Sequence, residues 1–222
     1  MESNVVSRSS VTSRPSSSPK KRLRTDDDDD YELGSSPTRL SLESLQRDKS
    51  LWYPDGTVVL VCNDTAFQVY QGVLAQRSTV FRDMFRLAPP AINAEHMDGC
   101  LVVRLSDSAL DIQYLLHALF SNMKFYRPSA RFAFTSLAAV IRLSYKFQIE
   151  YLVTEAIAYL QETFPINAPE HFLTLEQYSQ QCPMQFEPAD AIAVVNLGKL
   201  TRTTSMLPFA FFICALLDLK SS

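Results

Sequence analysis

The sequence predicts an α+β fold in which a small sheet, formed early in the folded part of the chain, is covered by helices. Three short β-branched and apolar runs lie between residues 57 and 105, and beyond them apolar residues recur at helical spacing to the end of the chain. Three strands are too few to close into a barrel, so helices must cover a face of their sheet. The 222 residues show no internal repeat.

The first 50 residues are expected to form a disordered tail. They are rich in Ser and contain one aromatic residue, Tyr31, although the chain has 14 Phe, 9 Tyr and 1 Trp. Such a segment buries too little apolar surface to offset the conformational entropy that ordering costs. We therefore expect order to begin near Leu51. Residues 51–222 are long enough to enclose a sizeable core.

The sheet is expected to contain three strands, at 57–62, 66–70 and 101–105. The first two form a hairpin because the polar pair Asn63 and Asp64 separates them. Residues 88–98 contain Pro89 and Pro90, so we expect a loop there that no regular element crosses.

Helices are expected between and after these strands, around 73–74 and over 80–85, 109–120, 135–147, 150–163, 169–180, 188–200 and 205–219. Ser78 is the expected N-cap of the second helix, and Ser108 with Asp111 resembles a capping box at the third. A loop bounded by prolines is expected over 182–188. The last helix is apolar nearly all round, so it either folds back on the helices of 165–200 or is buried in a partner.

Several segments, in this order, resemble one known family. The segments at 55–61, 67–85, 102–108 and 142–152 resemble the strands and helical pairs of the BTB/POZ domain. The resemblance covers 51–164 and in detail points to the large BTB group of basidiomycete fungi. Residues 165–222 resemble the helical extension of such fungal members. The hallmark positions are Asp55, Phe67, Val69, Leu74, Ser78, Phe81 and Phe85.

The resemblance implies a non-catalytic, regulatory protein–protein interaction module that pairs with itself as a homodimer about a two-fold axis. Two alternatives stay open, a substrate adaptor of a cullin-based ubiquitin ligase and a nuclear transcription co-regulator. The candidate partner loop contains Met97 and Asp98, and it lacks the Glu that cullin-binding members often carry. Many members also have His and a basic residue where this chain has Tyr70 and Gln71. These departures favour self-assembly and partner binding over a cullin contact.

No enzyme, metal site or cofactor is expected. His96 and Cys100 are four residues apart, but a structural zinc ion needs four ligands. No nucleophile motif occurs, and five glycines form no phosphate-binding loop. The four cysteines show no paired spacing, so a reducing intracellular compartment is expected; they are Cys62, Cys100, Cys182 and Cys214.

Neither a membrane nor a nucleic acid is an expected partner. The most apolar run, residues 206–217, contains Pro208 and is shorter than the ~20 residues of a membrane span. The folded part carries no block of basic residues, so nucleic-acid binding would depend on the tail alone.

The tail contains a basic cluster that predicts nuclear import and a nuclear or nucleo-cytoplasmic location; its residues are Lys20, Lys21, Arg22 and Arg24. The alternative is a charge run that only keeps the tail solvated, as the acidic run at 26–30 does. The candidate phosphorylation sites are Ser18, Thr25 and Ser36. Phosphate beside the cluster would reduce its positive charge and so could mask it.

Overall fold

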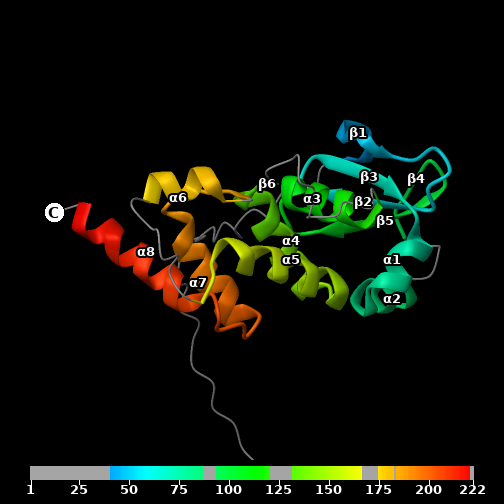
Figure 1. Ribbon diagram of the computed structural model, residues 1–222. Coiled ribbons are helices and arrows are strands. Elements are labelled where there is room, and N and C mark those ends of the chain that lie inside the picture. The colour runs from blue at the N-terminus through cyan, green and yellow to red at the C-terminus, as the bar shows by residue number, and fades with distance from the viewer. Residues whose placement is uncertain (1–40, 88–93, 121–131, 167–174, 183, 221–222) are drawn as a thin grey trace, which may run out of the picture. The chain divides into compact units, whose positions relative to one another are not determined.

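The structure, a computed structural model, describes residues 41–87, 94–120, 132–166, 175–182 and 184–220 (Figure 1). The import cluster at 20–24 and the candidate phosphorylation sites Ser18, Thr25 and Ser36 lie outside these residues.

A five-stranded mixed sheet has the strand order β1-β3-β2-β5-β4. Its strands are β1 Gln46–Trp52, β2 Val58–Cys62, β3 Thr65–Val69, β4 His96–Met97 and β5 Cys100–Leu105. The expected hairpin is confirmed, since β2 and β3 pair antiparallel and Asn63 in their turn has a φ of 53°. β5 pairs parallel with β2, β1 pairs parallel with β3, and β4 pairs antiparallel with β5.

Two expectations about this region are wrong. Order begins before Leu51, because a short 3-10 helix, η1 Leu42–Ser44, and strand β1 precede it. Leu45 and Leu51 are buried, and their burial holds this otherwise polar segment against the sheet. Residues 88–98 also contain a regular element, since the two residues of β4 pair with Leu101 and Cys100.

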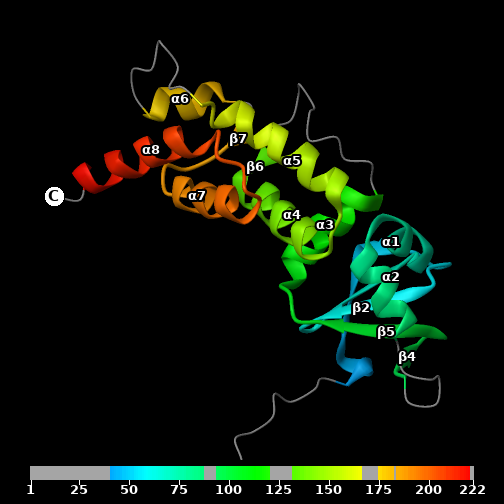
Figure 2. The same cartoon turned by 90° about the horizontal axis from the view of Figure 1, so that it is seen from below.

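The helices between residues 71 and 163 lie where the apolar spacing predicts them. They are α1 Gln71–Arg77, α2 Thr79–Arg86, α3 Ala109–Phe120, α4 Phe134–Lys146 and α5 Glu150–Thr163. Ser78 is confirmed as the N-cap of α2, because its hydroxyl accepts a hydrogen bond from the amide of Phe81. α4 contacts α3, α5 and α7, and these helices lie side by side in Figure 2.

The C-terminal part contains α6 Leu175–Gln181, α7 Asp190–Leu200 and α8 Leu207–Lys220. The loop expected over 182–188 includes a short strand, β7 Met184–Gln185, which pairs with β6 Phe132–Ala133. Of the two expectations for the last helix, folding back is confirmed: α8 packs on α7 and buries Phe209 and Ile213.

The sheet has an apolar core on each side, because alternate residues of a strand point to opposite faces. Val58, Leu60 and Cys62 of β2 join the main core, which continues through the helices to Ile213. Val59 and Val61 join a smaller cluster with Leu45, Ala66 and Val102. Leu42 and Leu45, in the segment just before β1, pack on this small cluster. The segment is therefore part of the folded unit.

Candidate protein-interaction surfaces

Most hallmark residues stabilise the interior and do not form a binding surface. Phe67, Val69, Leu74 and Phe81 are buried, and the ring of Phe81 stacks on Phe147 with centroids 4.4 Å apart. Phe85 is partly buried and stacks on Phe81 at 5.9 Å. Ser78 is 1% exposed, and its hydroxyl donates to the carbonyl of Phe147. Ser78 and Phe81 therefore join the α1–α2 pair to the α4–α5 turn.

Asp55 lies on the surface at the turn before β2. Its carboxylate accepts a hydrogen bond from the hydroxyl of Tyr70 over 2.8 Å. This bond, more than burial, raises the pKa of Tyr70, because the phenolate could no longer donate to the carboxylate. Tyr70 also stacks on Tyr53, and both rings contact Phe120. An uncharged aromatic group thus occupies the place where many family members carry His and a basic residue.

The outer side of α1 is open at Gly72. Leu74 is its single buried residue, whereas Val73 and Ala75 are partly exposed. Gly72 is exposed, and a Cβ added there would meet no atom within 4 Å. The first turn of α1 therefore lets a second surface approach its backbone closely at Gly72, whereas the exposed Gln76 and Arg77 occupy its last turn.

A groove lies where α1, α4 and α5 meet. It consists of two adjoining hollows of about 540 and 520 Å³ that share Gln148 and Glu150. Its walls include Tyr145 and Tyr151, which are 46% and 44% exposed. Arg77 fixes the second ring, because it donates to the Tyr151 hydroxyl and its guanidinium lies 5.5 Å from the ring centroid. Exposed aromatic rings around a hollow are typical of a surface that receives a protein partner.

The floor of the groove has an unusual backbone. Gln148, in the turn between α4 and α5, has a φ of 53°, and Thr79 donates to its side-chain oxygen. The hydroxyl of Ser144, beneath this turn, is buried without a hydrogen-bond partner. The turn is therefore held in an uncommon conformation by contacts from α2.

The candidate partner loop is engaged with β1. Met97 is partly buried against the small cluster, and Asp98 has a φ of 50°. The Asp98 carboxylate forms an ion pair with Arg47 over 2.9 Å, with each side chain half exposed. Arg47 also lies over the ring of Trp52. A role of this loop in partner binding stays a prediction.

α8 leaves part of its apolar surface uncovered. Phe211 and Phe212 are 50% and 43% exposed, while Phe209 and Ile213 are buried. Within the described residues, no helix has the length and apolar character needed to cross a membrane.

One cluster brings together the residue types of a hydrolase, and sequence reasoning did not find it. Ser50 Oγ lies 3.2 Å from Nε2 of His117, which is 67 positions away in the chain. The Ser50 hydroxyl, however, donates its proton to Asp48 over 2.7 Å. A nucleophile needs its proton directed to the His, with the Asp on the other ring nitrogen, so this arrangement does not activate Ser50.

Metal-binding groups do not come together in the described part of the chain: no three His, Cys, Asp or Glu side chains there are placed to share an ion. His96 instead contacts the carbonyl of Ala94 through Nδ1, and the Cys100 thiol contacts the carbonyl of Gly56. The four cysteines are free thiols.

One comparison with known proteins agrees with this architecture. A search of curated proteins gave no match to the chain. A sequence model of the family described as BTB/POZ domain matches residues 55–164, which run from the turn before β2 to the end of α5. Residues 55–164 of this chain are a BTB/POZ domain.

Proposed function

We propose that this protein is a non-catalytic, regulatory module that associates with a second copy of itself, and that α1 lies in the contact. A BTB/POZ domain implies a protein–protein interaction module, and BTB domains mediate self-association and the binding of protein partners. The family is generally non-enzymatic, and a Ser50 hydroxyl that donates to Asp48 is consistent with a non-catalytic role.

The open space at Gly72 of α1 is the observation that carries the proposal. Gly72 presents bare backbone to solvent, and Val73 and Ala75 beside it are small and partly exposed. Tyr70, directly before the same helix, belongs to an aromatic cluster with Tyr53 and Phe120 and extends the candidate contact surface. Small residues allow close packing, and half-exposed aromatic rings contribute most to interface stability.

Light scattering coupled to size exclusion on the full chain tests the proposal. The expected mass is twice the 25.1 kDa of one chain. Gly72→Arg places a large side chain where the single chain has open space, so the fold should tolerate it while the dimer dissociates. Ala158→Arg, on an exposed position of α5, is the matched control and should stay dimeric.

A monomer for the unmodified chain, at concentrations up to about 100 µM, would contradict self-association, since a specific interface has a Kd well below that value. A dimer that survives Gly72→Arg would place the contact elsewhere. The aromatic rings on the outer side of α8 would then be the next surface to change, because Phe211 and Phe212 are exposed.

The groove between α1, α4 and α5 supports the adaptor role as a second candidate. Its aromatic walls and its hollow of about 520 Å³ suit an apolar side chain from a partner helix. A pull-down with a purified cullin tests this role. Tyr145→Asp should abolish capture, whereas Gly72→Arg should not affect it. Failure of the unmodified chain to capture cullin would contradict the adaptor role and leave self-association intact.

The role of nuclear co-regulator depends on the tail, and the import cluster at 20–24 supports it. The affiliation with the basidiomycete group stays a prediction that depends on the sequence resemblance alone.

A further inference from the structure

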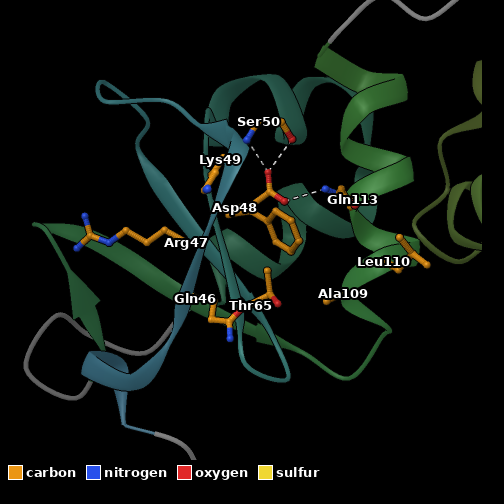
Figure 3. A pocket seen from close by; sticks show the side chains of 10 residues that line it. Gln46, Arg47, Asp48, Lys49, Ser50, Thr65, Ala109, Leu110 and Gln113 are labelled. Atoms are coloured by element: carbon orange, nitrogen blue, oxygen red, sulfur yellow. Dashed lines mark hydrogen bonds between the residues drawn. The ribbon is translucent and has the colours of Figure 1, made fainter.

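The edge strand β1 contains a bulge next to α3. Gln46 and Arg47 pair with Thr65 and Ala66 of β3, and pairing resumes only at Trp52, opposite Gln68. Residues 48–51 of β1 therefore face a single residue of β3, and the surplus makes the strand bend away from the sheet. The bulge borders a hollow of about 440 Å³, which Leu110 and Gln113 of α3 also line (Figure 3).

Asp48 holds this bulge together. Its Oδ1 accepts from the Ser50 amide at 2.8 Å, the Ser50 hydroxyl at 2.7 Å and the Leu51 amide at 2.9 Å. Its Oδ2 accepts from Nε2 of Gln113 at 2.8 Å, which ties the bulge to α3 (Figure 3). Partial burial raises the pKa of Asp48, but these hydrogen bonds together outweigh it and leave the pKa below its ordinary value. The bulge is thus built around a carboxylate anion.

Ser50 is exposed. Its hydroxyl donates to the Asp48 carboxylate and also lies 3.2 Å from Nε2 of His117 on α3. β1 is an edge strand, and its residues 48–51 lie outside the ladder with β3. Protein kinases bind the segment around an acceptor hydroxyl in an extended form. An enzyme can therefore extend the segment around Ser50 by opening its hydrogen bonds to Asp48, without breaking a pairing of the sheet.

The residues around Ser50 are those that a basic-directed kinase selects. Arg47 lies three positions before it, Lys49 directly before it and Leu51 directly after it. Arg47 is half exposed and pairs with Asp98 at the surface, so an acidic groove can compete for it. Of the exposed serines nearby, Ser44 has Ser41 three positions before it and lacks this signal.

We propose that Ser50 is a phosphorylation site, and that its phosphorylation detaches the bulge of β1 from α3. In the reaction, Ser50 Oγ bonds to the γ-phosphorus of ATP, the bond from that phosphorus to the ADP oxygen breaks, and the hydroxyl proton passes to the base of the kinase. The source of the phosphate is ATP, and the enzyme is a kinase that selects Arg three residues before the acceptor.

Detachment follows from the chemistry of the ester. The esterified Oγ has no proton, so its hydrogen bond to Asp48 is lost. The new group carries about −1.5 to −2 charges beside a carboxylate, and like charges at this distance repel. His117 can donate to the phosphate, but it makes one contact with Ser50, whereas Asp48 makes three within the bulge and one to Gln113. The repulsion therefore acts on the carboxylate that ties the bulge to α3 through Gln113, whereas His117 offers the phosphate a single donor.

The test uses the full chain, ATP with Mg²⁺ and the catalytic subunit of cyclic-AMP-dependent protein kinase, followed by peptide mass spectrometry. Phosphate is expected on Ser50 and not on Ser44. A synthetic peptide of residues 44–54 keeps the result independent of folding. Arg47→Ala in this peptide should lower the initial rate at Ser50 at least tenfold. Phosphate on the peptide but none on Ser50 of the full chain would overturn the assignment of the site.

Hydrogen–deuterium exchange then tests detachment. After phosphorylation, amides 46–52 should exchange at least tenfold faster, while those of α4 stay unchanged. Ser50→Ala, which loses the hydroxyl without adding charge, should give a smaller acceleration and take up no phosphate at position 50. Full phosphorylation of Ser50 with unchanged exchange at 46–52 would overturn the proposed detachment.

Discussion

The hydroxyl of Ser78 donates to the carbonyl oxygen of Phe147 and accepts from the amide of Phe81, and it thereby joins two helical pairs through one buried atom. Ser78→Ala should lower the free energy of unfolding by about 1–3 kcal/mol, because an N-cap is lost and a buried carbonyl loses its donor. Urea unfolding measures this.

The matched control for Ser78 is Thr154→Ala. Its hydroxyl also donates to a backbone carbonyl, that of Glu150, but on the exposed side of α5. The change should shift the free energy of unfolding by about 0.5 kcal/mol or less. Equal effects of the two variants would contradict a special role for Ser78.

Asp48→Asn should cost stability at neutral pH and nothing in acid. The folded state lowers the pKa of Asp48, so its contribution is present above the unfolded value of about 3.9 and disappears as pH falls through the folded value. Because the side chain is largely solvated, about 1 kcal/mol is expected at pH 7. Chemical unfolding of both proteins from pH 7 to pH 3 measures the difference. A difference that stays constant over this range would contradict the role of the charge.

The fold could be predicted wherever apolar periodicity extends over several turns or residues. α4 and α5 each place an apolar stripe on the core, and β2 and β3 have a polar turn between two apolar runs. β1 escaped prediction because Gln46–Trp52 contains Arg, Asp and Lys and buries Leu51 alone. The two-residue strands β4, β6 and β7 are too short to carry a period, and tertiary pairing sets them.

The candidate surfaces were less predictable than the fold. Gly72 has no pattern around it, and its significance appears only when the open space beside it is known. The contact of Ser50 with His117 joins residues 67 positions apart. The spacing of apolar residues in one sequence cannot reveal a contact between such distant positions. The apolar character of α8 was visible in the sequence, but which side meets α7 depends on the packing of Phe209.

Cys62 should resist thiol reagents in the folded protein. Burial, and secondarily the charge of Asp107, raise the pKa of this thiol to about 12. The neutral thiol is therefore favoured, and its contribution to stability is fully present below the unfolded pKa of about 8.5 and is lost as pH rises from there through the folded value. At pH 8, a disulfide reagent should modify Cys62 at least a hundredfold more slowly in the folded than in the urea-unfolded chain. Labelled-peptide mass spectrometry checks this, with the partly exposed Cys100 as internal reference. Equal labelling of both cysteines would contradict the burial.

The basic cluster of the tail should direct nuclear import. We expect the full chain, fused to a fluorescent protein, to accumulate in nuclei, and the change of Lys20, Lys21, Arg22 and Arg24 to Ala to remove that accumulation. Thr25→Asp adds negative charge beside the cluster and should reduce the nuclear fraction, whereas Thr25→Ala should not. Equal nuclear fractions for the unmodified and the alanine-substituted chains would show that the cluster only solvates the tail.

Two phenylalanines of α8 should differ strongly in their effect on stability. Phe209 is 1% exposed and its ring meets Tyr178 edge-on with centroids 5.1 Å apart, so Phe209→Ala should cost about 3–5 kcal/mol. Phe211 is 50% exposed, so Phe211→Ala should cost about 1 kcal/mol or less. Thermal and urea unfolding measure both. If a partner chain covered most of α8 instead, both variants would change the oligomeric mass. In the dissociated chain, Phe209→Ala would then lower the free energy of unfolding no more than Phe211→Ala does.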